Sequence, residues 1–284
     1  MVKMAWTPPA GIFHIRFDTV WPMSSNTARP NNPLPAPPLP GADARWALLL
    51  DIDGTLLDFS DDPASVAASP ALIGLLHDLH AALDGALALI SGRTLDDIDR
   101  IVGHRHWAAA GLHGTELRRA DGSFRRGHVS AISQALMRQA ANDLAARFEG
   151  VLVEDKEQAM ALHCRNDPDQ LAALQAAAGE LQLADYELQP GREVLEFRPA
   201  GMDKGEAVRQ LLDCAPFVGR TPVYLGDDLT DEQAFKRVNR VEGISVRVGL
   251  REPTQARFTL ADPVATLAWL GRVLDATSHG KPFA

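Results

Sequence analysis

The sequence predicts an α/β fold, in which a smaller α+β domain is inserted into a doubly wound (Rossmann-like) parallel sheet. Two stretches, 44–115 and 200–273, repeat one unit: a short apolar run, then polar or small residues, then an amphipathic helix. Between them, residues 116–199 change to alternating apolar and polar positions with hairpin turns. Because 46% of the 284 residues are hydrophobic, the chain can supply a core for each part.

The ends of the chain differ from these three segments. Residues 1–43 carry nearly half of the 19 prolines, a composition that excludes a helix or a central strand and predicts a flexible leader. Residues 274–284 are expected to form a tail. A domain inserted into another needs two connections, so we expect hinges near residues 115 and 200.

The first part of the core contains two clear strand and helix units. Residues 46–51 lack alternation, as expected for a parallel strand covered on both faces, and Ser69-Pro70 caps the helix that follows. Residues 86–90 form the next apolar run, and Thr94 caps the helix after it, with Asp97 three residues further on. A third strand is expected at 107–110.

The second part of the core repeats this order. Asp203 caps a helix, residues 222–225 form a strand, and Gly226-Asp227-Asp228 leads into a helix around Phe235. One more strand is expected at 244–248.

The insertion is expected to hold hairpins, helices and strands of its own. Turn residues stand at Asp121-Gly122 and Pro190-Gly191, and two Ala-rich helices are expected at 131–147 and 168–182. Its expected strands are Val151–Lys156, Met160–Arg165 and Val194–Arg198. Each strand has one apolar and one charged face.

Charge and composition exclude several classes of partner. The net charge of -9 argues against binding to nucleic acid or to an anionic membrane. The sequence has no apolar run of about 18 residues and no secretory signal, so we expect a protein that stays in the cytoplasm. We also expect it to be a monomer. Cys164 and Cys214 lie far apart, and we expect both to be small core residues.

Polar residues directly follow the apolar runs of the core. They are Asp51 with Asp53, Ser91, and Asp227 with Asp228, and Lys204 opens a helix. In an open parallel sheet, residues at the carboxyl ends of the strands share one crevice. For each carboxylate taken alone, a helix cap or a surface turn is the simpler explanation. Together they favour a site of oxygen ligands that suits Mg²⁺, with Ser91 and Lys204 able to hold a phosphoryl group.

Four motifs, in order and spacing, resemble those of the haloacid dehalogenase-like (HAD) phosphatases. They are Asp51-Ile52-Asp53-Gly54-Thr55-Leu56, Ser91-Gly92-Arg93, Lys204-Gly205-Glu206 and Gly226-Asp227-Asp228. The resemblance implies that Asp51 is the covalent nucleophile, that Asp53 is the general acid and base, and that Lys204 neutralises charge. It also implies an Mg²⁺ ion held by Asp51, the backbone carbonyl of Asp53 and Asp227, with Asp228 either a ligand or an orienting group. The insertion then corresponds to the cap of this superfamily.

Strings in the cap and at the core edge closely resemble trehalose-6-phosphate phosphatases over roughly residues 46–250. They are Val153-Glu154-Asp155-Lys156, Leu162-His163-Cys164-Arg165, Val194-Leu195-Glu196-Phe197-Arg198-Pro199, Gly111-Leu112-His113-Gly114 and Gly226-Asp227-Asp228-Leu229-Thr230-Asp231-Glu232. The resemblance implies hydrolysis of trehalose 6-phosphate, supplied by a separate trehalose-phosphate synthase. It also implies substrate contacts from the residues Glu154, Lys156, Arg165 and Glu196 of the cap and Ser91, Arg93, His113 and Glu116 of the core.

Two alternatives remain open at this stage. The same core and cap would serve a phosphatase for sucrose 6-phosphate or mannosyl-3-phosphoglycerate. A sugar-phosphate sensor without turnover is the second, although a pure binder does not need both Asp51 and Asp53. For each charged cap residue singly, a solvated surface position is the simpler explanation.

Overall fold

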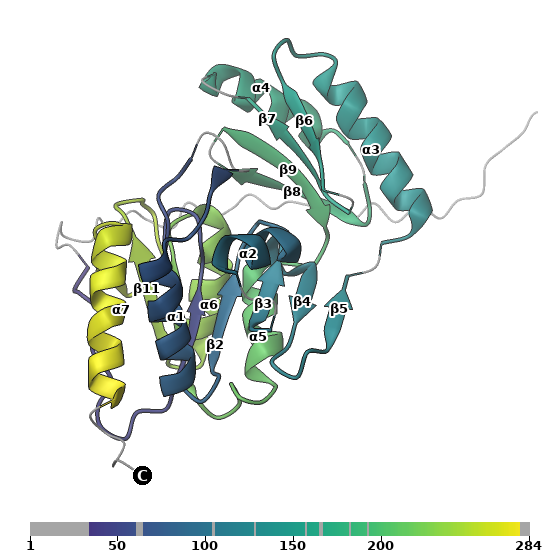
Figure 1. The fold of residues 1–284 in the computed structure, drawn as a ribbon. Coiled ribbons are helices and arrows are strands. Elements are labelled where there is room, and N and C mark those ends of the chain that lie inside the picture. The colour runs from purple at the N-terminus through teal and green to yellow at the C-terminus, as the bar shows by residue number, and fades with distance from the viewer. Residues whose placement is uncertain are drawn as a thin grey trace, which may run out of the picture. The chain divides into compact units, whose positions relative to one another are not determined.

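The computed structural model describes residues 34–60, 65–103, 106–127, 129–156, 158–164, 167–181, 183–191 and 193–278. These residues form one sheet of eight strands and a separate sheet of four (Figure 1). The predicted fold class, a doubly wound core with an inserted α+β cap, is confirmed.

The large sheet has the strand order β12-β11-β10-β1-β2-β3-β4-β5. Its strands from β12 to β3 pair in parallel. The bounds are β1 Trp46–Leu50, β2 Leu87–Ile90, β3 Ala108–Gly111, β4 Glu116–Arg118, β5 Phe124–Arg126, β10 Thr221–Gly226, β11 Ile244–Val248 and β12 Phe258–Leu260. Strands β1 and β2 are buried along their whole length, which explains their continuous apolar sequence.

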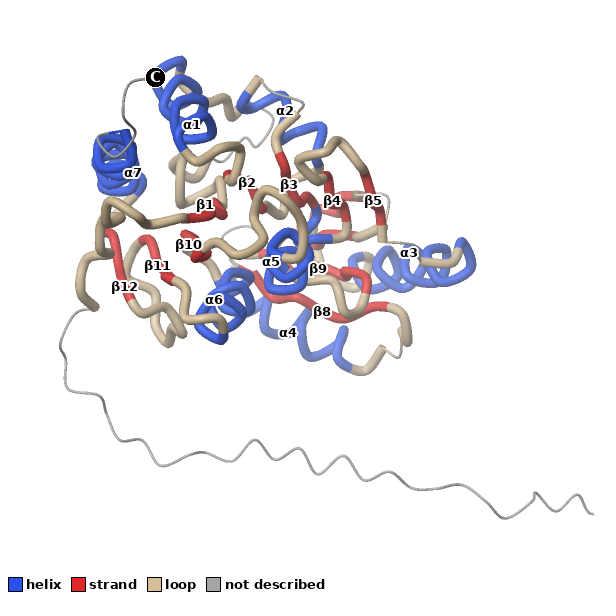
Figure 2. Tube along the Cα trace, turned by 90° about the horizontal axis from the view of Figure 1, so that it is seen from below, coloured by secondary structure: helices blue, strands red, loops and turns tan. Residues whose placement is uncertain are grey.

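Helices cover both faces of this sheet (Figure 2). One face carries α1 (Pro70–Ala82), α2 (Leu95–Val102) and α7 (Pro263–Ser278), and the other carries α5 (Lys204–Leu212) and α6 (Glu232–Arg240). The predicted caps are present. Ser69 accepts a hydrogen bond from the Leu72 N–H at 3.2 Å, and Thr94 accepts one from the Asp97 N–H at 3.2 Å.

One edge of the large sheet differs from the prediction. Strands β4 and β5 pair antiparallel with β3 and with each other, so the hairpin at Asp121-Gly122 belongs to the large sheet and not to the insertion. The expected cap boundary at residue 116 therefore precedes two strands of the core sheet. Alternation with period two is common to an antiparallel sheet edge and to the strands of a cap, so the sequence pattern did not separate them.

The small sheet is antiparallel with the order β6-β7-β9-β8. Its elements are β6 Leu152–Asp155, β7 Met160–His163, β8 Tyr186–Gly191, β9 Val194–Pro199 and the helices α3 Ala131–Ala145 and α4 Pro168–Gly179. Met160, Leu162, Leu195 and Phe197 form a second core with these helices. Gly191 pairs with Val194, so this hairpin turns just after the predicted Pro190-Gly191.

Both ends of the described chain are more ordered than expected. The carbonyl of Pro35 accepts a hydrogen bond from the Thr259 N–H at 3.0 Å, and the Pro38 carbonyl accepts one from Trp269 Nε1 at 3.3 Å. A proline lacks the N–H but keeps its carbonyl, so residues 34–43 can line the edge strand β12 without being a strand. The rest of the predicted leader, 1–33, lies outside the described residues. Helix α7 runs to Ser278, into the predicted tail.

Among the described residues, no helix combines the length and the apolar composition needed to cross a bilayer.

Candidate active site

Residues that follow neighbouring parallel strands meet at the carboxyl end of the large sheet, as the sequence predicts. Asp51 follows β1, Ser91 follows β2 and Asp227 follows β10. The Asp51 N–H donates to the Leu225 carbonyl at 3.0 Å, which continues the β1 and β10 pairing up to the site. Asp51 and Ser91 are 4% and 1% exposed, so both polar side chains lie in a low-dielectric environment.

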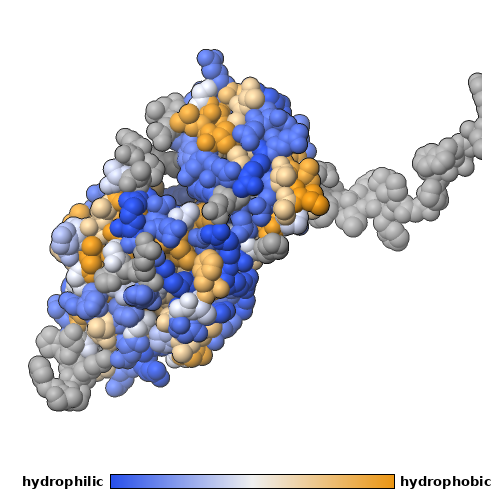
Figure 3. Space-filling model, turned by 45° about the vertical axis from the view of Figure 1, so that its right-hand side comes forward, coloured by the Kyte–Doolittle hydropathy of each residue, from blue (hydrophilic) through white to orange (hydrophobic). Residues whose placement is uncertain are grey.

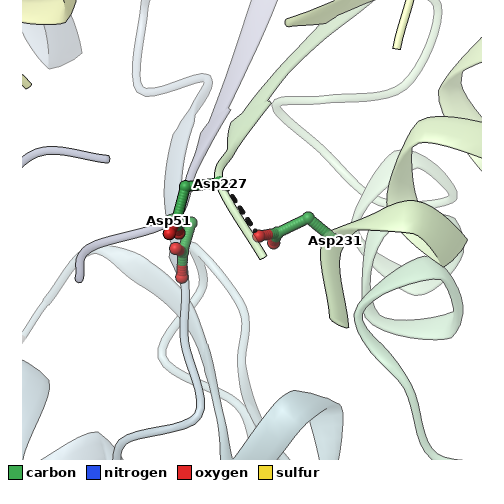
Figure 4. Close-up of side chains that lie close together, drawn as sticks. All are labelled: Asp51, Asp227 and Asp231. Carbon is green, nitrogen blue, oxygen red and sulfur yellow. Dashed lines mark hydrogen bonds between the residues drawn. The ribbon is translucent and has the colours of Figure 1, made fainter. Parts of the chain in front are cut away.

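Three carboxylates form a cluster at this point. Oxygens of Asp51, Asp227 and Asp231 lie within 4.8 Å of one another. Figure 4 shows the side chains of Asp51 and Asp227 close together, while Asp231 approaches from the start of the following helix. Burial raises the pKa of Asp51 well above its ordinary value, although Lys204 partly opposes this, and burial together with Asp231 raises the pKa of Asp227 to about 7.

Lys204 supplies the positive charge within the cluster. Its Nζ donates to Asp51 Oδ1 at 2.8 Å and to Asp231 Oδ1 at 2.7 Å. Burial would lower the pKa of Lys204, but the two carboxylates outweigh burial and raise it, so the side chain remains an ammonium. The same carboxylates offset the unfavourable position of a cation in the first turn of α5.

Asp231 is a member of this cluster that the sequence analysis did not single out. Its Oδ1 accepts from Lys204 and from the Tyr224 hydroxyl at 2.6 Å, and its Oδ2 accepts from the N–H groups of Asp227 at 3.0 Å and Asp228 at 2.9 Å. Both oxygens are thus saturated with donors, and the side chain is fully buried. The available signal was an acidic residue four positions after Asp227, within the quoted string that starts at Gly226.

The remaining carboxylate oxygens fit a divalent cation. Asp227 Oδ1 is buried and has no hydrogen-bond partner among the described residues. Asp51 Oδ2 has a long hydrogen bond of 3.3 Å from the Thr55 hydroxyl. Hard cations prefer such oxygen ligands, and an ion here would relieve the repulsion between the two carboxylates. Asp228 is different, because its Oδ1 pairs with Arg251 and not with the cluster.

Asp53 lies on the turn after Asp51, where Arg93 binds it. Arg93 Nε and Nη2 each donate to one oxygen of Asp53 at 2.7 Å, which is a bidentate pair. The next residue, Gly54, has φ +74°, and a Cβ there would overlap the Asp227 carboxylate. Only glycine allows this turn to approach Asp227 so closely.

His113 is fixed next to the Ser91 loop by its backbone. The His113 N–H donates to the Ser91 carbonyl at 3.0 Å, and the Leu112 N–H donates to the Arg93 carbonyl at 2.8 Å. Leu112 and His113 have φ values of 48° and 56°, a left-handed conformation that is costly for side chains of this size. The ring is packed so tightly on Gly92 that a Cβ there would lie 2.7 Å from it.

A charged network joins the core to the cap. His113 Nε2 lies 2.9 Å from Glu196 Oε2, and Lys156 Nζ lies 3.2 Å from Glu196 Oε1. Burial would raise the pKa of Glu196, but Lys156 and His113 outweigh burial and lower it. Glu154 is about half exposed and pairs with His163 at 2.9 Å. Arg165, the fourth predicted cap residue, lies outside the described residues.

Glu116, one of the predicted substrate contacts, binds two groups within the chain. It is buried, its Oε2 accepts from the Leu95 N–H at the start of α2 at 2.9 Å, and its Oε1 pairs with Arg126. Both oxygens have partners within the chain, and the role of Glu116 as a substrate contact stays a prediction.

Comparison with known proteins identifies the family. The sequence pattern of the trehalose-phosphatase family matches residues 49–264. The chain belongs to this trehalose-phosphatase family. The matched range includes all four HAD motifs and every predicted site residue, so the resemblance drawn from the motifs is confirmed.

Relatives of the trehalose-phosphatase family match most of the chain. A Sinorhizobium fredii protein named "Probable trehalose-phosphate phosphatase" is 45% identical over 209 residues, which are 72% of this chain and 78% of that protein. The trehalose-6-phosphate phosphatase of Escherichia coli is 38% identical over 250 residues, 85% of this chain and 91% of that protein. The structure of the C-terminal domain of C. albicans trehalose-6-phosphate phosphatase superposes with a TM-score of 0.72 at 24% identity, covering 81% and 93% of the two chains, and it supports the fold.

Proposed function

We propose that this trehalose-phosphatase family member hydrolyses trehalose 6-phosphate to trehalose and phosphate through an aspartyl-phosphate on Asp51. A separate trehalose-phosphate synthase would supply the substrate, and the reaction would take place in the cytoplasm. The observation that carries the proposal is the buried Asp51 carboxylate, held by the Lys204 ammonium at 2.8 Å at the carboxyl end of the sheet. Relatives named for this activity support the choice of substrate.

In the first step, an oxygen of Asp51 attacks phosphorus and forms the new O–P bond. The bond from phosphorus to the oxygen on C6 of the sugar breaks, and its electron pair stays with that oxygen. Asp53 donates a proton to this oxygen and releases trehalose. Lys204 and the Ser91 hydroxyl stabilise the negative charge around phosphorus.

In the second step, Asp53 takes a proton from water, and the water oxygen attacks phosphorus. The Asp51 O–P bond breaks, so phosphate leaves and both carboxyl groups return to their starting states. In this structure Arg93 donates to both oxygens of Asp53, so at least one of these hydrogen bonds must open before Asp53 can transfer a proton.

The cofactor in this proposal is Mg²⁺. Asp51, the backbone carbonyl of Asp53 and Asp227 would hold it, as the unpartnered Asp227 oxygen favours. The ion supplies a charge that neutralises phosphate oxygens. Of the two roles open for Asp228, its pairing with Arg251 favours the orienting role over direct ligation.

In the cap, Glu154, Lys156, Arg165 and Glu196 would recognise sugar hydroxyls. Lys156 and Glu196 form an ion pair at 3.2 Å, and His113 of the core lies 2.9 Å from Glu196. Hydroxyl groups both donate and accept, so a sugar can replace such contacts on both partners at once.

A substrate panel tests the choice of substrate. With Mg²⁺ present, kcat/KM is expected to be higher for trehalose 6-phosphate than for sucrose 6-phosphate and mannosyl-3-phosphoglycerate by orders of magnitude. A flat profile, or preference for another compound, would contradict the proposal.

Two variants separate an enzyme from a sensor. Asp51→Asn and Asp53→Asn are each expected to abolish phosphate release, whereas Asp78→Asn, on the exposed surface of α1, serves as a matched control with unchanged turnover. Phosphate release retained by Asp51→Asn would refute covalent catalysis. Binding of the substrate without any turnover by the native chain would favour the sensor.

A further inference from the structure

A cavity lies between the edge hairpin of the large sheet and the cap strand β6. It has a volume of about 420 Å³ and is formed by the start of α2, the β4–β5 hairpin and the end of β6. None of Asp51, Asp53, Lys204 or Asp227 lines it, whereas Lys156 of the cap does. The volume is within the usual range for small-molecule sites.

The charges around this cavity balance one another. Three cations and three acids line it: Arg118, Arg126, Lys156, Asp96, Glu116 and Asp155. Each cation pairs with a carboxylate, since Arg118 lies 2.6 Å from Asp99, Lys156 lies 3.2 Å from Glu196, and Arg126 pairs with Glu116. A phosphate would find no excess positive charge here. A neutral ligand with many hydroxyl groups would find fixed donors and acceptors.

Phe124 provides an apolar wall. It stands on β5 at the cavity and remains 56% exposed, so the ring is accessible to a ligand. The Arg126 guanidinium lies 6.0 Å from the ring centroid, and Glu116 holds that guanidinium in turn. Figure 3, in which the right-hand side of Figure 1 comes forward, shows a mainly hydrophilic surface with apolar patches between. An exposed ring among paired charges suits the apolar face of a sugar ring.

Lys156 connects this cavity to the contacts between cap and core. It pairs with Glu196 at 3.2 Å, and Glu196 binds His113 of the core at 2.9 Å. Lys156 therefore lines this cavity and also belongs to the network that joins the cap to the core.

We propose that the cavity binds the sugar ring that does not carry the phosphate, with Phe124 as its stacking face and the β4–β5 hairpin as a specificity element of the core. This inference rests on the proposed function, because it assigns a place to the leaving group of that reaction.

The test compares substrates with and without a second ring. Phe124→Ala is expected to raise KM for trehalose 6-phosphate about five- to tenfold, the range typical of a lost aromatic contact. It should leave both kcat and KM for p-nitrophenyl phosphate unchanged, since that compound has no sugar ring to place. Trehalose, added as a product inhibitor, should bind the variant more weakly by a similar factor. Phe124→Tyr keeps the ring and should restore the native values.

Val218→Ala serves as the control, because Val218 is also 56% exposed but does not line the cavity. Unchanged KM for trehalose 6-phosphate in Phe124→Ala would overturn the inference. Equal losses on both substrates would also overturn it, since they would indicate a general structural role. Failure of the proposed function looks different: the native chain would then hydrolyse p-nitrophenyl phosphate but not trehalose 6-phosphate.

Discussion

Asp231→Asn perturbs the group that orients both Lys204 and the Asp227 turn. The four hydrogen-bond donors around Asp231 divide equally between its two oxygens. Asparagine keeps only one oxygen, so its amide NH₂ faces two donors in either orientation. The substitution therefore removes at least two hydrogen bonds. Lys204 pairs with the carboxylates of Asp51 and Asp231 in this structure, and only Asp51 remains as a carboxylate in the variant.

The size of the effect follows from burial, because Asp231 is 0% exposed and Lys204 is 3% exposed. Removing one partner of a buried ion pair costs about 3–5 kcal/mol of unfolding free energy. At about 2–4 °C per kcal/mol for a chain of this size, the midpoint of thermal unfolding should fall by roughly 6–20 °C. Loss of a positioned charge at the reacting phosphoryl group should lower kcat by at least about a hundredfold.

Thermal unfolding and steady-state turnover of p-nitrophenyl phosphate check the two effects. Turnover is measured at about 20 °C, below the unfolding midpoints, so that the variant is folded during the assay. The Mg²⁺ concentration is the same for all variants. Asp78→Asn removes a carboxylate that is 64% exposed on α1 and should change neither quantity. If Asp231→Asn kept both the unfolding midpoint and kcat within experimental error, the assignment of Asp231 as the positioning residue would be refuted.

Three further perturbations follow from the site. The pKa of Glu196 is lowered in the folded chain, so its pairing stabilises the protein at pH values above the unfolded pKa of about 4.3. This stabilisation is lost as the pH falls through the lower folded pKa. Glu196→Gln should therefore flatten the acid side of a plot of unfolding free energy against pH, and an unchanged plot would contradict the pairing. Gly54→Ala should abolish turnover because the added Cβ would overlap the Asp227 carboxylate. Gly150 also has a positive φ but open space around it, so Gly150→Ala should cost only about 1 kcal/mol of unfolding free energy. Equal effects of the two variants on turnover and on unfolding would argue against the close approach of Gly54 to Asp227. Removal of metal ions by a chelator should stop turnover, and added Mg²⁺ should restore it. Asp227→Asn should raise the Mg²⁺ concentration needed for half-maximal activity more than Asp228→Asn does. The reverse order in an Mg²⁺ titration would make Asp228 the ligand.

The sequence was most informative where one physical rule decides the geometry. Parallel strands end at one edge of a sheet, so the meeting of Asp51, Ser91 and Asp227 followed from their positions after three apolar runs. Lys204 was placed with them by its motif and by its position at the start of a helix, where the dipole disfavours a cation that has no acidic partner. These residues needed no knowledge of side-chain contacts.

Other features depend on contacts between distant parts of the chain. In the sequence, Asp231 is one of several acidic residues near the start of a helix. Only its full burial among four hydrogen-bond donors distinguishes it from its acidic neighbours. The β4–β5 hairpin has the same alternation as a cap strand, and its partner β3 decides where it belongs. Glu116 matched a substrate contact, but its oxygens bind Arg126 and the start of α2. The pair of His113 with Glu196 joins two domains, which no local pattern reports.

The most direct test of the account is to find the phosphoryl group on the enzyme. Native enzyme is mixed with trehalose 6-phosphate and Mg²⁺, quenched in acid during turnover, digested and analysed by mass spectrometry. The account predicts a phosphoryl group on the peptide that contains Asp51, and none on that peptide in Asp51→Asn. A phosphoryl group on another residue, or turnover of trehalose 6-phosphate by Asp51→Asn, would contradict it.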